Sequence, residues 1–191
     1  MTSPEDSLQR LIEKLNQQGI PYMLSGSFSS SLHGQPRATR DVDIVIAPTE
    51  KQLLEFSESL GEDYYVSLEA VGDALAHNSM FNIIDNQSGW KADFILCKDR
   101  PFSHQEFKRK CLTKIKDLDV WVTSAEDTIL SKLEWAKDSQ SQQQFRDALG
   151  VAVVQWDHLD ADYLLKWAKE LQVEDSLKRL LEQARKLVET E

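Results

Sequence analysis

One six-residue segment constrains the fold more than any other part of the sequence. Asp41-Val-Asp-Ile-Val-Ile46 consists of β-branched and apolar residues, which favour an extended strand, with two carboxylates near its start. An apolar run of this kind is typical of a strand in the middle of a sheet. Because successive strand residues point to opposite faces, Asp41 and Asp43 project to the same side. The segment therefore predicts a central strand that directs two carboxylates to one place.

Two neighbouring carboxylates favour a bound cation. Like charges raise each other's pKa unless a positive charge lies between them. Carboxylate oxygens are hard ligands that suit Mg²⁺. Strand ends also carry solvated acids, so Asp41 and Asp43 by themselves leave both interpretations open.

Apolar periodicity, capping residues and turn residues divide the rest of the chain into helices and strands. We expect helices at residues 4–18, 26–33, 50–60, 125–137, 140–156, 160–171 and 174–186. We expect strands at residues 21–24, 41–46, 64–68, 80–84, 91–96 and 120–122. The strands at 80–84 and 91–96 should form a hairpin, and the strand at 120–122 should lie at a sheet edge. The expected fold class is α+β, a small mixed sheet flanked by helices with a C-terminal helical part.

A third carboxylate lies alone in another apolar strand. The segment Lys91-Ala-Asp-Phe-Ile-Leu96 has a single acid, Asp93, near its middle. A lone carboxylate in a buried strand is costly unless something compensates it. A metal ion could do so, and the structural alternative is a salt bridge to Lys91, which shares the face of Asp93.

A glycine turn precedes the acid pair. Leu24-Ser-Gly-Ser27 takes the chain from a strand into a helix and leaves unpaired N–H groups at the helix start. Such groups can hold a phosphate, and Gly26 would permit its close approach. A Gly-Ser turn alone is common, so its meaning depends on the acids that follow.

Composition excludes several classes of function. The formal net charge of −10 excludes a protein that coats nucleic acid non-specifically, because such binding needs many Lys and Arg contacts to phosphates. No apolar run could span a bilayer, and the first residues lack the order of a secretion signal, so we expect a cytoplasmic protein without membrane contact. The two cysteines, Cys97 and Cys111, are expected to be reduced thiols.

A basic segment at residues 108–116 allows two interpretations. It could guide a nucleic-acid acceptor such as the end of a transfer RNA. We favour a solvated amphipathic helix that directs Phe107, Cys111, Leu112 and Ile115 inward.

Aromatic side chains are assigned mainly to packing. The tryptophans at positions 90, 121, 135, 156 and 167 could stack on bases, but most stand among apolar helix or strand positions. We therefore expect them in the core, and we expect His33 to pack at a helix end.

Together the turn and the acids resemble the nucleotidyltransferase superfamily of DNA polymerase β-like proteins. The family pattern is a Gly-Ser or Gly-Gly turn, an acid-x-acid pair on a strand, and a third acid on a later strand. The prokaryotic branch of abortive-infection, toxin-type and antibiotic nucleotidyltransferases also has a His-Gly and an Arg-x-Thr before the acid pair. The matching residues here are Gly26-Ser27, His33-Gly34, Arg37-x-Thr39, Asp41-x-Asp43 and Asp93, with Ser124–Leu133 and Arg146-Asp147 resembling the start of the helical half.

The resemblance implies an architecture and an activity. It implies a nucleotidyltransferase catalytic core at residues 1–120 and a helical part at 121–191 that packs on it. It implies transfer of a nucleoside monophosphate from a nucleoside triphosphate to a hydroxyl, with release of pyrophosphate. Asp41, Asp43 and Asp93 would be catalytic and would bind Mg²⁺, and Asp93 could also act as a general base. The implied nucleotide-binding residues are Gly26, Ser27, Arg37, Arg40 and Lys132.

Several alternatives remain open at the level of the sequence. Arg37 and Arg40 could equally be solvated loop residues, and Lys132 could be an exposed helix lysine. Arg146-Asp147 is interpreted as a structural pair that ties the two halves together. The acceptor could be an RNA end, a protein or a small molecule such as an aminoglycoside. The rival to an enzyme is a non-catalytic protein that retains the fold and binds a nucleotide or an antitoxin-like partner.

Overall fold

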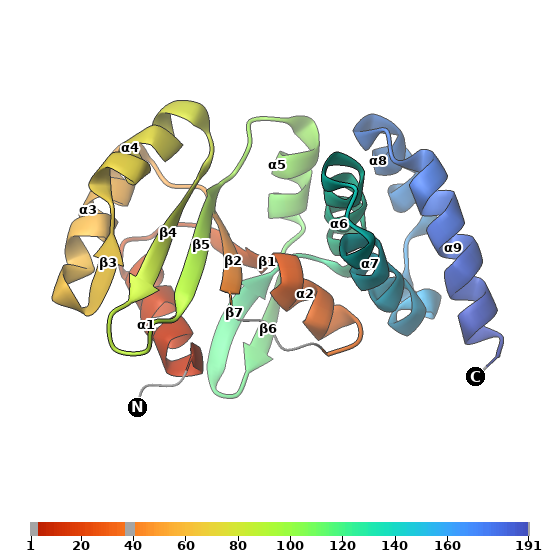
Figure 1. Cartoon of the computed structure of the whole chain (residues 1–191), viewed down its shortest axis with the longest axis horizontal. Coiled ribbons are helices and arrows are strands. Elements are labelled where there is room, and N and C mark those ends of the chain that lie inside the picture. Colours follow the sequence, from red (N-terminus) through yellow and green to blue (C-terminus); the bar gives the residue numbers. More distant parts are fainter. Residues whose placement is uncertain (1–3, 37–40, 191) are drawn as a thin grey trace.

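A mixed sheet forms the centre of the protein (Figure 1). The computed structural model describes residues 4–36 and 41–190, and in these ranges the sheet has seven strands in the order β3-β4-β5-β2-β1-β7-β6. The strands are β1 (Tyr22–Ser25), β2 (Asp41–Ile46), β3 (Tyr64–Val66), β4 (Met80–Asp85), β5 (Lys91–Leu96), β6 (Cys111–Ile115) and β7 (Leu118–Val122). Strand β2 occupies the middle position, as expected, and β4 and β5 form the expected antiparallel pair.

Helices surround the sheet at both ends (Figure 1). The helices are α1 (Pro4–Gln17), α2 (Gly26–His33), α3 (Glu50–Ser59), α4 (Leu68–His77), α5 (Pro101–Lys108), α6 (Ala125–Ser139), α7 (Gln142–Val154), α8 (Ala161–Leu171) and α9 (Glu174–Val188). Helices α3 and α4 lie at the β3 side, whereas α6 to α9 are stacked beyond α2 and α5. The α+β class is confirmed. Within the described ranges, no helix is both long and apolar enough to cross a membrane.

The sheet has one apolar face and one polar face. On β2 and β5 the residues at even positions are buried, and they join α1, α3 and α4 in the larger of two apolar cores. The residues at odd positions include Asp41, Asp43, Lys91 and Asp93, and these project from the opposite face. The alternation that builds the core therefore also gathers the acids on one side of the sheet.

The second core lies within the helical part. Phe102 of α5 packs there with buried side chains of α6 to α9, such as Leu130, Leu164 and Leu177. At the boundary with the sheet, the imidazole Nε2 of His33 lies 2.7 Å from the carbonyl oxygen of Thr123. This contact holds the end of α2 against the segment that follows β7, which agrees with the packing role expected for His33.

A charged network joins α5 to the helical part. Arg109, which follows α5, lies 2.9 Å from a carboxylate oxygen of Glu126 and 3.5 Å from one of Asp127. Its guanidinium also lies over the ring of Tyr163, 3.6 Å from the centroid. Nearby, Arg100 of the loop after β5 makes a two-pronged contact with Glu134, at 2.5 and 2.7 Å. These ion pairs fix α6 and α8 against the sheet-side elements.

The expectation of a helix at residues 108–116 is wrong. Helix α5 ends at Lys108, and the residues from Cys111 to Ile115 form β6, which pairs antiparallel with β7. The two-residue turn between them is Lys116-Asp117, and it lacks the Gly or Asn that commonly marks a tight hairpin. Because β6 takes the sheet edge, β7 is an internal strand rather than the expected edge strand.

Two short helices were not expected from the sequence. Helix α4 begins where strand β3 was expected to continue to residue 68, because the Ser67 side chain caps it by accepting from the Ala70 amide. Helix α4 ends at Asn78, which has the left-handed conformation with φ of 46°. Helix α5 has Pro101 in its first turn, a position that proline favours. Both helices are short, which makes them harder to recognise from the sequence.

Candidate functional site

The strand register brings the three predicted acids together. Strands β2 and β5 pair in parallel so that Asp43 lies opposite Asp93 and Asp41 lies opposite Lys91. Neighbouring strands are about 4.8 Å apart, and all four side chains project from the same face. Two strands separated by 44 residues of chain, from Ile46 to Lys91, thus place three carboxylates and one ammonium in a single group.

Asp43 lies in an electrostatic environment that disfavours its charged form. Burial raises the pKa of Asp43, and the negative charge of Asp93 raises it further. The charge of Lys132 and a hydrogen bond from the backbone amide of Ser27 act in the opposite direction, but the pKa of Asp43 remains raised. The group therefore contains negative charge that its protein neighbours compensate only in part.

Lys91 connects the other two acids. Its ammonium lies 3.0 Å from Oδ1 of Asp93 and 3.7 Å from Oδ2 of Asp41. The hydrogen bond to Asp93 is the main cause of a raised pKa of Lys91. The side-chain amide of Asn82, opposite Asp93 on β4, also donates to Asp93 Oδ1. The salt bridge considered as the structural alternative for Asp93 is thus present, and the Asp93 carboxylate has a fixed orientation.

The donor set suits a hard divalent cation. Asp41, Asp43 and Asp93 offer only carboxylate oxygens, the ligands that Mg²⁺ prefers. The raised pKa of Asp43 shows that further positive charge would be favourable beside it. Among the residues described, however, no three acidic, thiol or imidazole side chains already converge as a metal site. An ion that contacts all three carboxylates therefore requires their side chains to move closer together.

Gly26 is required by the position of Asp43. Its φ of +61° is left-handed, and a Cβ atom at this residue would overlap the Asp43 carboxylate. From the sequence, we expected this glycine to permit the close approach of a phosphate. In the structure, its lack of a side chain also leaves room for the Asp43 carboxylate. Helix α2 begins at this residue, and its N-cap Ser25 makes no side-chain capping hydrogen bond. The turn therefore joins the start of α2 directly to the acid group.

Lys132 is buried, so its interpretation as an exposed helix lysine is wrong. Its relative exposure is 5%, and its ammonium lies 3.3 Å from Oδ2 of Asp147 on α7. Asp147 also accepts a hydrogen bond of 2.7 Å from Gln143. Because the Lys132 charge lowers the pKa of Asp43, the ammonium acts on the acid group from the helical side. The contact between Lys132 and Asp147 thus connects α6 to α7.

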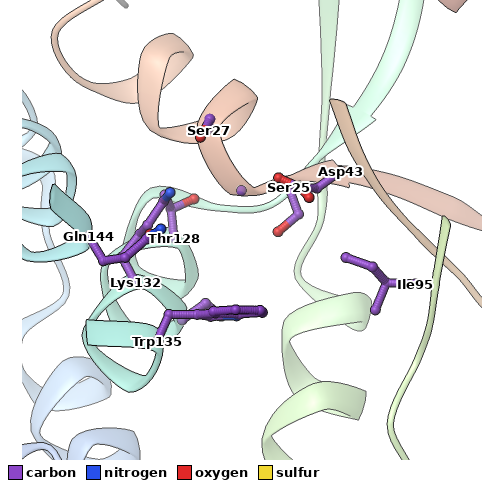
Figure 2. Close-up of a pocket in the computed structure, with 10 residues that line it drawn as sticks. Ser25, Ser27, Asp43, Ile95, Thr128, Lys132, Trp135 and Gln144 are labelled. Carbon is purple, nitrogen blue, oxygen red and sulfur yellow. The ribbon is translucent and has the colours of Figure 1, made fainter. Parts of the chain in front are cut away.

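A pocket of about 160 Å³ lies between these elements (Figure 2). Its wall on α6 is formed by residues three or four positions apart, which is the spacing of one helix face. The lining residues are Ser25, Gly26, Ser27, Asp43, Ile95, Thr128, Ser131, Lys132, Trp135 and Gln144. The sheet, the start of α2 and one face of α6 therefore enclose a single pocket, which is lined by the carboxylate of Asp43 and the ammonium of Lys132.

Comparisons with known proteins address the fold. No family model and no curated protein matches the sequence. Among solved structures, an antigenic nucleotidyltransferase-like protein from Paracoccidioides brasiliensis matches with a TM-score of 0.64, covering 96% of this chain and 89% of its own, at 15% identity. The lincosamide antibiotic adenylyltransferase LnuA matches with a TM-score of 0.56 over 78% of this chain and 97% of its own, at 14% identity. The antibiotic-resistance factor ANT(2'')-Ia matches with a TM-score of 0.55, covering 100% of this chain and 96% of its own, at 12% identity.

The chain has the nucleotidyltransferase fold. The likeness confirms the fold that the turn and the acid pattern implied. It extends over the helical part as well as the sheet, because the matches cover most or all of the chain. In this nucleotidyltransferase fold, the proposed roles of individual residues depend on the geometry above and remain predictions.

Two of the implied nucleotide-binding residues cannot be placed. Arg37 and Arg40 lie outside the described residues, in the segment that precedes β2. Gly26, Ser27 and Lys132, in contrast, all line the pocket. Four of the residues implied for nucleotide and metal, Gly26, Ser27, Asp43 and Lys132, therefore line one pocket, and Asp41 and Asp93 lie beside Asp43 on β2 and β5.

The sequence analysis missed the side chain that dominates one wall of the pocket. Trp135 was expected in the core, but 58% of its surface is exposed and it lines the pocket. Trp121 is also 37% exposed, whereas Trp90 and Trp167 are buried as expected. A usable signal was present in the sequence, because Trp135 is three residues after Lys132 and so belongs to the same helix face.

Proposed function

We propose that this protein is a Mg²⁺-dependent nucleotidyltransferase, which moves a nucleoside monophosphate from a nucleoside triphosphate to a hydroxyl acceptor. The observation that carries the proposal is the register of β2 and β5, which sets Asp43 opposite Asp93 with Asp41 two residues away. The fold supports the same activity. A group of three carboxylates beside a helix start and a buried lysine is suited to phosphoryl chemistry.

Asp41, Asp43 and Asp93 would hold Mg²⁺. When bound, the metal ion balances phosphate charge and stabilises the departing pyrophosphate. The three acids gain as well, since a cation relieves the repulsion that raises the pKa of Asp43. Lys91 would balance part of the remaining negative charge, since it contacts both Asp41 and Asp93.

Different residues of the protein would bind the phosphates and accept the proton of the acceptor. The Ser27 hydroxyl, the amides at the start of α2 and the Lys132 ammonium would hold the phosphates, with Arg37 and Arg40 as further proposed ligands. Asp93 Oδ would take the proton of the acceptor hydroxyl, because Asn82 already orients its carboxylate. Binding and proton transfer thus depend on different side chains, which makes them separable by mutation.

The two-part organisation supports this division. We assign residues 1–120 to a catalytic core and residues 121–191 to a helical part that packs on it. The last sheet strand ends at Val122 and α6 begins at Ala125. The core would supply the acids, and the helical part would supply Lys132 and close one side of the pocket.

The acceptor would be an RNA end, a protein or a small molecule. Among the structural neighbours, LnuA was solved with lincomycin and ANT(2'')-Ia with adenylyl-2''-tobramycin. These neighbours make a small hydroxylated molecule the first class of acceptor to test. A cytoplasmic location and an antitoxin-like partner protein remain part of the proposal.

A non-catalytic protein that binds a nucleotide or an antitoxin-like partner is the second candidate. The observation that favours it is the salt bridge of Lys91 with Asp93 and Asp41, because it occupies two of the three carboxylates. Pyrophosphate release separates the two candidates. A non-catalytic protein would bind nucleotide without releasing any.

Calorimetric titration with each nucleoside triphosphate, with and without Mg²⁺, tests the proposal. We expect Mg²⁺-dependent binding in the wild type and its loss in a double variant with Asp41→Asn and Asp43→Asn. The matched control is the double variant Asp117→Asn and Asp119→Asn, which removes an equally spaced acid pair from the exposed β6–β7 hairpin. Unchanged binding in the Asp41/Asp43 variant would refute the proposed metal site.

A further inference from the structure

The pocket has a polar end and an apolar end. Figure 2 shows Ser27 and Asp43 at one end of the space, and Trp135 and Ile95 across from one another at the other end. Trp135 comes from α6 and Ile95 from β5, so the two elements that enclose the pocket each contribute one apolar surface. The apolar end therefore forms a slot between an indole ring and an aliphatic side chain.

The exposure of Trp135 shows that this slot is not part of either core. Its relative exposure is 58%, although Trp90 and Trp167 are buried to 8% and 6%. Indole surface left in water inside a pocket is unfavourable for folding, and it becomes favourable when a flat apolar ligand covers it. The ligand that covers it must also suit the polar end of the same space.

The spacing on α6 relates the slot to the phosphate-binding end. Trp135 follows Lys132 by three residues, about 4.5 Å along the helix axis, and both lie on the face that lines the pocket. A ligand whose phosphates contact Lys132 and the start of α2 would thus extend its other end towards Trp135. A nucleoside triphosphate has this form, with charged phosphates at one end and a flat base at the other.

We propose that the base of the nucleoside triphosphate stacks on Trp135 and that this contact selects purines, an inference that rests on the proposed function. Every base has a face that stacks on an aromatic ring, and the larger purine ring system covers more of the indole. Ile95, which lines the same pocket, would contact the edge of the base. Trp135 is accordingly a specificity-determining residue of the nucleotide site.

The polar groups near the slot do not discriminate between adenine and guanine. The hydroxyl of Thr128 donates to the Ser124 carbonyl at 2.7 Å, and the hydroxyl of Ser131 donates to Glu106 at 2.8 Å. These two donors are therefore used within the protein. The Gln144 amide also lines the pocket, and by rotation it can present either a donor or an acceptor to a base edge. Base area therefore determines the preference.

Binding measurements on Trp135 variants test the inference. The probes are ATP, GTP, CTP, UTP and inorganic tripolyphosphate, each in Mg²⁺ with wild type, Trp135→Ala and Trp135→Phe. In the wild type we expect ATP and GTP to bind within a few-fold of each other and more tightly than CTP, UTP and tripolyphosphate. Trp135→Ala should weaken ATP and GTP binding at least about five-fold and leave tripolyphosphate binding unchanged. Trp135→Phe should restore most of the affinity.

A second exposed tryptophan supplies the control. Trp121 lies on β7, outside the residues that line the pocket, so Trp121→Ala should bind ATP like the wild type. If Trp135→Ala binds ATP as tightly as the wild type, the inference is wrong. It is also wrong if the variant loses affinity for ATP and for tripolyphosphate equally, because an equal loss indicates structural damage. If the wild type binds tripolyphosphate as tightly as ATP and GTP, the inference about Trp135 is wrong, but the proposed function is not contradicted. Failure to bind any of the five probes would overturn the proposed function as well.

Discussion

Two groups of three carboxylates in this protein are compensated in different ways. The sheet cluster, Asp41, Asp43 and Asp93, lies on the polar face of β2 and β5 and has Lys91 as its contacting cation. The helix cluster, Glu106, Glu126 and Asp127, lies where α5 meets the helical part. In the helix cluster Arg109 contacts both Glu126 and Asp127, and hydroxyl groups donate further hydrogen bonds to Asp127 and Glu106. In the sheet cluster Lys91 contacts Asp41 and Asp93.

The partners of the helix cluster satisfy its acids within the protein. Asp127 accepts hydrogen bonds from Tyr163 at 2.5 Å and from Ser124 at 2.7 Å. Glu126 contacts Arg109, and Glu106 accepts from Ser131. Burial raises the pKa of Glu106 to about 8, so that this group keeps its proton at neutral pH. Burial also raises the pKa of Asp127, although Tyr163, Ser124 and Arg109 act in the opposite direction.

The difference between the clusters separates structural charge from functional charge. In the sheet cluster, burial and the charge of Asp93 raise the pKa of Asp43 while its compensation stays incomplete. Acids held together with incomplete compensation are poised to bind a cation from solution. We propose that the helix cluster serves stability and the sheet cluster serves catalysis, and the predictions below test that division.

The largest expected effect is on stability, in the helix cluster. Arg109→Met removes the cation that contacts Glu126 and Asp127. We expect the free energy of unfolding to fall by about 3 kcal/mol. This value is at the lower end for buried ion pairs, because the Arg109 side chain is 27% exposed. Lys91→Met in the sheet cluster should cost at most about 1 kcal/mol, since its side chain is 36% exposed. Urea denaturation measures both. Equal losses would erase the distinction between the clusters.

Asp93→Asn should show the opposite behaviour in the sheet cluster. We expect transfer to slow by at least about a hundred-fold, or about 2.7 kcal/mol, because the acceptor-side base is lost. Binding of Mg²⁺-nucleotide should stay within a few-fold of wild type. Thermal melting and single-turnover transfer on the same preparation measure the two roles. An unstable protein with normal activity per folded molecule would instead assign Asp93 to its salt bridge with Lys91.

Lys132 tests whether a buried ion pair can also serve the functional cluster. Lys132→Met should weaken triphosphate binding by about 1–3 kcal/mol, the range of a charge-assisted hydrogen bond, and should also lower stability by leaving Asp147 without its partner on α6. The double variant Lys132→Met with Asp147→Asn should recover stability but not binding. Recovery of binding in the double variant would make the pair purely structural. Lys137→Met, elsewhere on α6, is the control.

A change of stability with pH, caused by Glu106, tests the protonated acid of the helix cluster. Its pKa is about 8 in the folded protein against an ordinary value of 4.5, so between these values the unfolded chain binds fewer protons than the folded protein. The contribution of Glu106 to stability is therefore present at low pH and is lost as pH rises towards 8. Glu106→Gln should flatten this dependence and melt higher than wild type at pH 8. Melting temperatures from pH 4 to 9 measure it; parallel curves would disprove the raised pKa.

The sheet cluster could be predicted in composition but not in register. The β-branched run before Ile46 and the apolar run after Lys91 are strong strand signals, and alternation then places Asp41, Asp43 and Asp93 on the face opposite the core. The parallel pairing that sets Asp43 opposite Asp93 depends on the whole sheet order. Local sequence contains no information on that order, so only the resemblance suggested that the acids meet.

Other predictions from the sequence were wrong because two different structures fit the same local pattern of residues. The segment from Cys111 to Ile115 suits either a strand or the continuation of an amphipathic helix, and its Lys116-Asp117 turn gave no hairpin signal. The burial of Lys132 depends on Asp147, on another helix. Trp135 has the helix spacing of a core residue, and its exposure follows from how α6 lies against β5. In each case a partner distant in sequence decides the outcome.

Transfer of label from α-phosphate-labelled ATP, GTP, CTP and UTP, in a cell extract with purified protein, tests the central claim most directly. We expect label on an acceptor together with pyrophosphate release, only when Mg²⁺ is present. Asp43→Asn should abolish both signals, whereas the Asp117/Asp119 double variant should behave like wild type. If folded wild-type protein binds a nucleoside triphosphate but transfers no label and releases no pyrophosphate, the sheet cluster is not catalytic and the proposed function is wrong.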